Sequence, residues 1–527
     1  MKSNSAAEEI WQAYEQADQY NSGIDLYETV RRNENFFIGK QWEGLSAPDL
    51  EKPVLNFLKR VVSYFISMIV SDDVAVSMTP FSQTEGDEET CKILSSEIER
   101  VIERTRAKNL HRDLLRNMAV DGDGCFYLYF DPEIQGGQPV PGEICIDCVD
   151  NTKVLFGNPH IWEVQRQPHL FIVLRQTLEA VREEGRQNGV SEEQLAAIQT
   201  DRENKYGEEA AGEADLTTVV AALWRDPKTK QVWAVKTTQN CIIKPWWNTG
   251  YRLYPVAYAS WDKVRSSYHG QAAISGLIPN QIFVNKLWAM AMEQQKSMAF
   301  PKIIYDRSKL PGGWTNGVGK AIGVEGNPND AIATGFRAPD MSAQVLELVQ
   351  RTIDYTRDFM GASDAALGNV KPDNTSAIIA VQKASSAPLE LQRLAFYQFV
   401  EDYVRIILEM MRVHYGPRLV SVEGENGQKA RALLDFSTID YDVLQLRVDV
   451  GSSAYWSELM QLQTLDNLYA KGIIQDAVTY LEGIPGSYVR NKNKIIAKLR
   501  EQQALMGQMS QGMPQTGGKI NGTMSDL

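Results

Sequence analysis

Two predicted helices on either side of a loop-rich insert constrain the fold of this 527-residue chain more than any other feature. Apolar residues recur at helical spacing over 272–300, and the helix ends there because a residue before a proline, here Pro301, disfavours helical geometry. A second helical pattern over 340–361 ends at Gly361. The first helix carries apolar residues on most sides, so the pair cannot bury its surface alone. It is either part of an ordinary globular core or is covered by further copies of the chain in a ring.

The insert between the helices is rich in Gly and Pro. Short apolar runs at 303–305 and 321–324 predict small strands joined by turns. A Gly-rich run at 312–320 superficially matches a phosphate-binding loop, but Trp314 stands at the first glycine position and Ala321 replaces the Ser or Thr that would hold Mg²⁺. We interpret the run as a turn and expect no ATP hydrolysis.

The charge of the chain argues against a broad nucleic-acid-binding surface. The net charge is −13, whereas such surfaces are basic. The stretch 271–360 holds nine Lys and Arg against eight Asp and Glu, a balance of +1, so the rest of the chain carries −14. A strongly basic channel would hold a DNA duplex by its phosphates, and a near-neutral lining with sparse basic residues would let the duplex slide.

The rest of the chain mixes helical and strand patterns, which predicts the α+β class. A Glu- and Gln-rich stretch at 179–215 is interpreted as a solvated helical excursion and 246–250 as a turn, and Pro388 should kink a long helix that runs from 374 to 415. Residues 506–527 are expected to be disordered. Further helices are predicted at 7–21, 24–37, 53–70, 88–104, 109–120, 453–470, 474–481 and 488–503, and strands at 74–78, 125–130, 142–150, 153–156, 170–174, 216–223, 232–237, 241–244 and 443–450.

The sequence predicts neither a secretory signal nor a membrane span. The first 16 residues are polar, and the most apolar helix, 53–70, contains Asn56, Lys59 and Arg60, so we interpret it as a buried amphipathic helix. Five cysteines, an odd number, suggest reduced thiols in a cytosolic setting.

We expect no metal, cofactor or catalytic site. Cys145 and Cys148 have CxxC spacing, but they lie in a strand pattern that places the two sulfurs on opposite faces. Residues 121–124, Asp-Gly-Asp-Gly, match half of a calcium loop without its later ligands and are interpreted as a turn. The five histidines show no metal-binding spacing, and no Gly-x-Ser-x-Gly motif is present.

Two segments resemble portal proteins of tailed double-stranded DNA bacteriophages. Residues 31–42, Arg-Arg-Asn-Glu-Asn-Phe-Phe-Ile-Gly-Lys-Gln-Trp, followed by the helix that holds Asn56 and a short strand, resemble the portal N-terminal region. Residues 267–270, Ser-Tyr-His-Gly, leading into 277–286, resemble the entry to the portal stem helix. The resemblance covers about residues 24 to 500.

The resemblance implies a portal fold with an α/β wing, a helical stem pair, a small β-rich clip, a long kinked helix with a tunnel loop, and a short helical crown. The implied parts are wing 1–265, stem helix 266–300, clip 301–339, returning stem helix 340–361, tunnel loop 362–376, long helix and return to the wing 377–450, crown 451–505 and tail 506–527.

It also implies residues that face DNA or partner proteins. The tunnel-loop candidates for the DNA backbone are Ser363, Asp364, Asn369, Lys371 and Asp373. The charged stem candidates are Lys286, Lys296, Arg351 and Arg357. The clip candidates for partner contact are Tyr305, Arg307, Lys309 and Trp314.

By the same resemblance the chain would form a homo-oligomeric ring, expected to be a dodecamer, at one capsid vertex of the virion after assembly in the host cytoplasm. Its partners would be double-stranded DNA passing without sequence readout, the terminase large subunit, the major capsid or scaffolding protein, and a neck or adaptor protein. A different ring-forming head or neck component and a soluble hydrolase with a dispersed active site stay open as alternatives.

Overall fold

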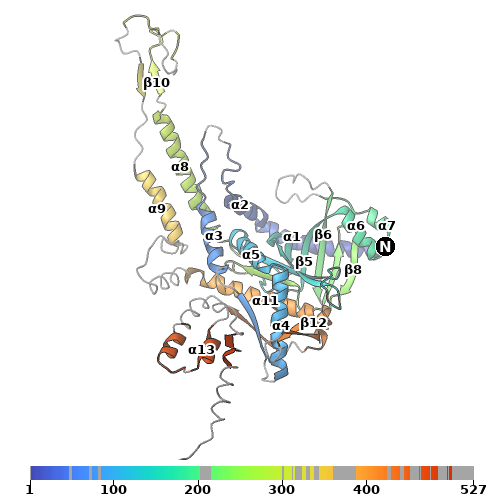
Figure 1. Cartoon of the computed structure of the whole chain (residues 1–527). Coiled ribbons are helices and arrows are strands. Elements are labelled where there is room, and N and C mark those ends of the chain that lie inside the picture. The colour runs from blue at the N-terminus through green and yellow to red at the C-terminus, as the bar shows by residue number, and fades with distance from the viewer. Residues whose placement is uncertain are drawn as a thin grey trace, which may run out of the picture.

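The computed structural model combines helices with several small sheets, so the predicted α+β class is confirmed (Figure 1). The described residues are 2–46, 50–70, 74–80, 85–201, 215–299, 302–310, 312–314, 323–327, 333–336, 343–359, 387–423, 429–439, 444–450, 462, 464–474, 476–484, 495–496 and 498–500.

The largest core lies between a three-stranded antiparallel sheet, in the order β3-β2-β9, and a set of helices. Aromatic side chains of the sheet and of α11 meet in this core, where Phe126 lies edge-on to Phe399 with 5.0 Å between ring centroids. The elements are α2 (Leu26–Ile38), α3 (Phe57–Val70), α4 (Glu85–Arg104), α5 (Ala107–Asp121), β2 (Asp123–Asp131), β3 (Glu143–Val149), β9 (Val256–Ser260) and α11 (Glu390–His414).

A five-stranded antiparallel sheet, in the order β4-β5-β6-β7-β8, forms the second part of the body. Helix α1 covers one face, where Ile10 and Tyr14 pack on Phe171 and Val220, and the other face packs toward the three-stranded sheet through Tyr254. The elements are α1 (Lys2–Gly23), β4 (Val154–Phe156), β5 (His169–Thr177), β6 (Leu216–Arg225), β7 (Val232–Thr237) and β8 (Ile242–Asn248).

A buried polar cluster joins the two sheets to the segment that leads into α8 (Ile278–Ala299). The two ring nitrogens of His269 lie 2.8 Å from Asp123 Oδ2 and 3.0 Å from Asn21 Oδ1, and the Gly270 amide donates to Asp123 Oδ1. Gly122 has a φ of +101°, and a Cβ there would lie 2.6 Å from the Gly270 carbonyl oxygen, so glycine is required for this close approach.

Helix α8 and its antiparallel partner α9 (Ala343–Phe359) project away from the body and carry the hairpin of β10 (Lys302–Tyr305) and β11 (Ala333–Phe336) at their far end (Figure 1). The residues at the base of α8, Ile278, Gln281, Val284 and Asn285, are buried in the body. The sequence-based expectation of a helix, an excursion and a returning helix is therefore confirmed as an arrangement of elements.

Two strands far apart in the sequence close the body at its other end. β1 (Val74–Pro80) pairs with β14 (Leu444–Val450), so the chain does return to the body after α11, as predicted. A hairpin of β12 (Pro417–Glu423) and β13 (Lys429–Asp435), which the sequence analysis missed, follows α11. The guanidinium of Arg418 is fully buried there and lies 3.1 Å from Glu143 Oε1, which ties the hairpin to β3.

The predicted start of the first long helix is wrong. The helix begins at Ile278 and not at 272, because the preceding backbone bonds to the body: the amide of Gln271 donates to the Asp262 carbonyl, and that of Ile274 to the Ala119 carbonyl. At 22 residues, α8 spans about 33 Å instead of the 40 Å that a longer helix would reach.

Other boundaries also differ. The strand that pairs with β10 is β11; Gly323 and Val324 lie outside any strand, and 321–322 lie outside the described residues. Trp246 to Asn248 continue β8 because they pair with β7, so the predicted turn at 246–250 is wrong over its first three positions. Pro388 lies in a short 3₁₀ turn, Ala387–Leu389, ahead of α11, where its missing amide removes no helical bond; the segment 374–386 lies outside the described residues.

The Glu- and Gln-rich stretch is not simply solvated. Its helices α6 (Leu178–Gln187) and α7 (Glu192–Ala196) bury Val181 and Leu195 against the sheet residues Val219 and Ile243, and Ile198 just after α7 joins the same cluster. Among the described residues, the predicted crown contributes α13 (Ala477–Gly483) and a helical segment at 464–470. No helix among the described residues has the length and apolar character to cross a membrane, and the apolar helix α3 is buried against the body.

The buried His111 makes the body sensitive to acid. Burial lowers the pKa of His111 to about 4 from its usual 6.5, and its Nε2 lies 3.1 Å from the Tyr403 hydroxyl. The unfolded state therefore takes up this proton first as the pH falls, so the free energy of unfolding should decrease by about 3 kcal/mol between pH 6.5 and pH 4. His111→Gln should flatten this part of the pH profile of denaturant unfolding. His160→Gln, at an exposed position, is the control; equal slopes for the two variants would contradict the assignment.

Candidate functional site: the projecting helix pair and the pocket at its base

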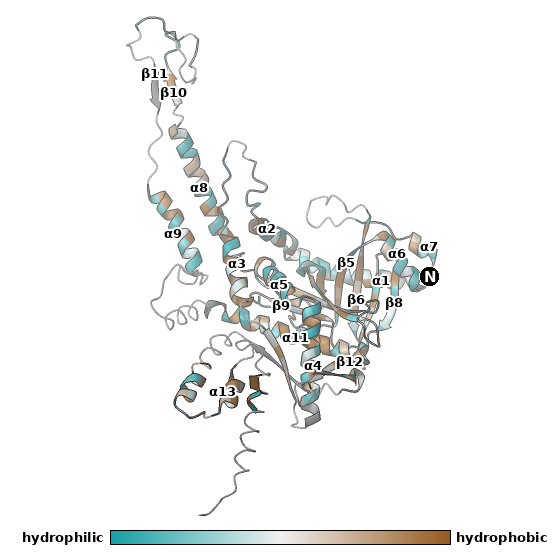
Figure 2. Cartoon of the chain, viewed as in Figure 1, coloured by the Kyte–Doolittle hydropathy of each residue, from teal (hydrophilic) through white to brown (hydrophobic). Residues whose placement is uncertain are grey.

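The projecting helices α8 and α9 leave large apolar side chains uncovered. Figure 2 shows hydrophobic and hydrophilic residues alternating along both projecting helices. Phe283 and Met290 on α8 are 42% and 64% exposed, and Leu348 and Tyr355 on α9 are 47% and 59% exposed. Each pair is seven residues apart, or about two helical turns, so each helix displays an apolar stripe. We call these four residues the outer stripes.

Buried amides fix the base of α8. Gln281 donates to the Leu55 carbonyl at 2.8 Å and to Asn285 Oδ1 at 2.9 Å, and Asn285 donates to Gln41 Oε1 at 2.6 Å. Gln41 in turn donates to the Phe36 carbonyl at the end of α2. This amide clasp, formed by Gln281, Asn285 and Gln41, holds α8 to the described residues 39–46 and 50–56 that follow α2.

Two further contacts brace the pair. Asn280 on α8 donates to Thr356 Oγ1 on α9 at 3.0 Å, and Lys296 Nζ lies 3.3 Å from Glu51 Oε1. The base of α8 is therefore bonded to α9 through Asn280, and its far end to Glu51 through Lys296, which sets the direction in which the pair leaves the body.

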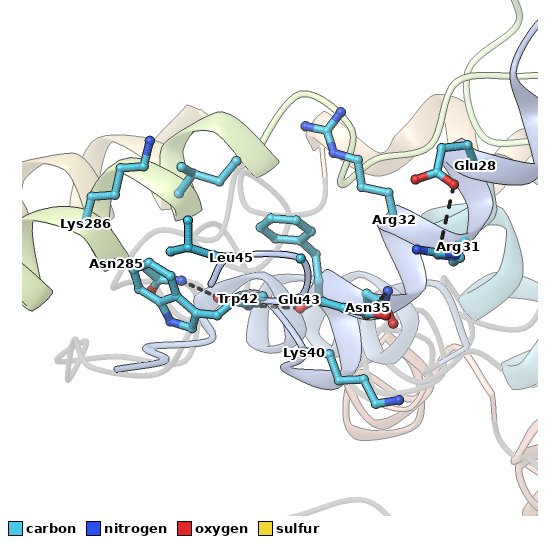
Figure 3. Close-up of a pocket in the computed structure, with 14 residues that line it drawn as sticks. Glu28, Arg31, Arg32, Asn35, Lys40, Trp42, Glu43, Leu45, Asn285 and Lys286 are labelled. Atoms are coloured by element: carbon cyan, nitrogen blue, oxygen red, sulfur yellow. Dashed lines mark hydrogen bonds and ion pairs between the residues drawn. The ribbon is translucent and has the colours of Figure 1, made fainter. Parts of the chain in front are cut away.

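A pocket of about 460 Å³ lies beside the clasp, between α2, the segment after it, and α8 (Figure 3). Apolar and charged side chains both line it. Figure 3 shows Arg32 and Lys286 reaching out on the same side, with Leu45 between them, and Lys40 pointing the opposite way. The lining residues are Glu28, Arg31, Arg32, Asn35, Phe36, Lys40, Gln41, Trp42, Glu43, Gly44, Leu45, Ile282, Asn285 and Lys286.

The charges of this pocket are not balanced. Glu28 pairs with Arg31 at 4.0 Å, and Glu43 accepts a hydrogen bond from the Asn35 amide. For the part of the chain that the structure describes, Arg32, Lys40 and Lys286 have no carboxylate within ion-pair distance.

A neighbouring hollow of about 360 Å³ shares Arg31, Lys40 and Glu43 and reaches Asp121. Burial raises the pKa of the Asp121 carboxyl to about 7 from its usual 3.8, and the nearby acids Glu34 and Asp150 add to this shift while Arg116 opposes it. The carboxyl is therefore partly neutral near pH 7, which reduces the charge repulsion among these acids.

The predicted stem residues fall into two environments. Lys286 lines the pocket, whereas the other three lie in ion pairs within the helices or with a neighbouring segment. Those three are Lys296 with Glu51, Arg351 with Glu347 at 2.6 Å, and Arg357 with Asp354 at 3.9 Å. The structure does not bring the four together.

The predicted clip residues gather at the far hairpin. Tyr305 ends β10, Arg307 and Lys309 lie in the turn after it, and Trp314 is 37% exposed in the segment beyond. The Asp306 carboxylate accepts hydrogen bonds from the Ser308 amide and hydroxyl, which holds this turn and lowers the Asp306 pKa. The predicted tunnel-loop residues, at 362–376, lie outside the described residues.

The sequence analysis did not identify the clasp or the pocket. Arg32, Lys40 and Gln41 lie within segment 31–42, and Asn285 and Lys286 within segment 277–286. These two segments carried the family resemblance and were the available signal. The spatial relation of Arg32, Lys40 and Gln41 to Asn285 and Lys286, more than 240 positions away, has no local pattern in the sequence.

The structure gives the CxxC pair no metal-binding character. Cys145 and Cys148 lie three positions apart in β3, so their side chains leave opposite faces of the strand, as predicted. Burial raises the pKa of the Cys148 thiol to about 12, so the thiolate that would bind a metal is disfavoured. Within the described ranges no group of His, Cys, Asp and Glu side chains could hold a metal ion.

Comparison with protein families decides the identity of this arrangement. The family model of the phage P22-like portal protein matches residues 160–453, more than half of the chain, from the five-stranded sheet through α8, α9 and α11 to β14. The chain belongs to the phage P22-like portal protein family. It is a bacteriophage portal, a structural head–tail connector of genome packaging. Comparison with curated proteins finds no match.

The clasp should control the segment 39–56 of this portal protein. Asn285→Leu removes the donor to Gln41 and the acceptor for Gln281, and an unpaired buried amide costs about 1–3 kcal/mol. We expect faster amide hydrogen exchange over 41–46 and 50–55. Gln295→Leu, an amide-to-leucine change at an exposed position of the same helix, should leave that exchange unchanged. Unaltered exchange in Asn285→Leu would show that the clasp does not hold the segment.

Proposed function

We propose that the chain assembles into a closed ring, expected to be a dodecamer, at one capsid vertex, with α8 and α9 of each copy arranged around an axial channel for DNA. This proposal rests on the exposure of the outer stripes. Four large apolar side chains are exposed on a helix pair whose base is firmly anchored, and such a surface marks a protein interface. Sister copies around an axis supply the missing cover, since a head-to-tail contact closes into a ring at a suitable rotation.

The parts of the chain take the roles that the family resemblance assigns. α8 and α9 are the stem. The hairpin β10–β11 with the turn after it is the clip, and docks first the terminase large subunit and later a neck or adaptor protein. The body that contains the two sheets is the wing and meets the major capsid or scaffolding protein. Segment 362–376 is the tunnel loop, with Ser363, Asn369 and Lys371 touching the duplex backbone without reading bases.

The ion pairs of the stem fit a channel through which DNA slides. Lys296, Arg351 and Arg357 each lie beside a carboxylate, so each binds a phosphate less strongly than a free cation would. Each phosphate that a protein neutralises adds to a salt-dependent affinity, and a near-neutral stem keeps that affinity low. The stem thereby guides the duplex without holding it.

Ring assembly should depend on the outer stripes. Burying a Phe or Met side chain stabilises an interface by about 1.5–3 kcal/mol, and a charge placed there opposes burial. We expect the double variant Phe283→Glu/Met290→Glu to stay a folded small species in native mass measurement, while the unchanged protein gives a ring with a central hole in negative stain. Gln295→Glu, which adds a charge at an exposed polar position of α8, is the matched control. A ring of unchanged mass in the double variant would refute the proposed interface.

The tunnel loop should act after assembly. Replacing 362–373 by a short Gly-Ser link should leave the ring mass unchanged and reduce the DNA that is packaged or retained in particles. The measurement is nuclease-protected DNA per particle in cells that supply the variant portal. Full-length genomes at normal yield would contradict the assignment of this segment.

A further inference from the structure

The pocket at the base of α8 combines uncompensated positive charge with an apolar floor. Arg32, Lys40 and Lys286 carry three charges without carboxylate partners among the described residues. Phe36, Trp42, Leu45 and Ile282 supply the apolar part of the lining, and Leu45 is 46% exposed. The pocket is net positive although the whole chain has a net charge of −13. This local positive charge favours a negatively charged ligand.

The arrangement of the cations disfavours a small anion. Arg32 and Lys286 extend on one side of the pocket and Lys40 on the opposite side, so the three do not converge on one point (Figure 3). A ligand that satisfies them has to be extended and to carry several negative groups.

The shape of the pocket disfavours DNA. A concave space of about 460 Å³ does not admit a duplex, whose phosphates are contacted by polar and basic surfaces and offer nothing to an apolar floor. A peptide that alternates acidic and apolar side chains matches both features, because its carboxylates can reach the rim while an apolar side chain enters beside Leu45.

The walls of the pocket are already fixed. Gln41 is held by Asn285 and bonds to the Phe36 carbonyl, and the Trp42 indole donates to the Pro53 carbonyl at 2.9 Å. Binding therefore costs little conformational entropy in the site, which favours high affinity for a short segment.

We propose that this pocket is a docking site for an acidic segment, with at least one apolar side chain, of a partner protein that joins the assembled portal. The proposal rests on the portal identity of the chain and does not depend on the outer stripes or on the tunnel loop. Arg32 and Lys286 form charge-assisted contacts with its carboxylates, and the floor around Leu45 receives the apolar side chain.

The test uses the full-length assembled protein and a fluorescein-labelled peptide that alternates Glu with Leu, followed by fluorescence anisotropy. We expect saturable binding that weakens as salt rises. The same peptide with Gln in place of Glu should bind much more weakly. The double variant Arg32→Glu/Lys286→Glu should lower the affinity at least about tenfold, since it replaces two attractions by repulsions. Leu45→Ser, at an exposed position, should lower affinity by a salt-independent factor.

A control double variant tests whether a loss of affinity comes from the pocket or only from the changed net charge of the protein. Lys228→Glu/Arg265→Glu makes the same change in net charge at exposed positions outside the pocket, and should keep the affinity of the unchanged protein. Equal loss in both double variants, or equal binding of the Glu and Gln peptides, would overturn the proposal.

Three further outcomes would also overturn it. Competition by inorganic phosphate would identify a small-anion site, and displacement by a short DNA duplex would identify a nucleic-acid surface. Binding of the peptide to the small species Phe283→Glu/Met290→Glu but not to the ring would assign the pocket to a neighbouring copy of the chain. Native mass measurement of each variant shows whether the ring is intact, so failure of assembly is distinguishable from failure of docking.

Discussion

The unequal burial of α8 along its length is the constraint on which the rest of the structure depends. One side of its base is embedded in the largest core and held by the amide clasp, whereas Phe283 on the other side of the base and Met290 further along are exposed. The anchored end fixes the direction of the projection, and the exposed stripes then have to be covered from outside. A rigid base combined with an unsatisfied outer surface is suited to identical neighbours arranged at a fixed angle.

The charges follow the same division. Along the projecting pair, the basic side chains of Lys296, Arg351 and Arg357 are paired with acids, which keeps this part near neutral. At the base, Arg32 and Lys286 lie beside an apolar floor with no carboxylate partner among the residues that the structure describes. Weak attraction suits a surface past which DNA moves, and concentrated charge with apolar contact suits a surface that holds a peptide. Both surfaces include residues of α8, but they differ in net charge and in apolar character.

Local sequence patterns predicted the elements well and their ends less well. The α+β class, the projecting helix pair, β14 and most helices of the body are present where periodicity placed them. The start of α8 was predicted too early because the amides of Gln271 and Ile274 donate hydrogen bonds to carbonyls of the body. The spacing of apolar residues does not reveal such long-range hydrogen bonds. The β12–β13 hairpin was missed although it buries Arg418, since a charged residue in a short run hides the strand pattern.

The sequence by itself determined that the chain contains two apolar helices unable to cover each other, and its segments 31–42 and 267–286 carried the family resemblance. These properties are local: they follow from residue type and spacing along a few turns of chain. Only the tertiary structure decided that Gln41 meets Asn285, that Lys286 lines the same pocket as Arg32, and that His269 lies between Asp123 and Asn21. Contacts of this kind join residues more than a hundred positions apart, and the packing that selects them exists only once the chain has folded.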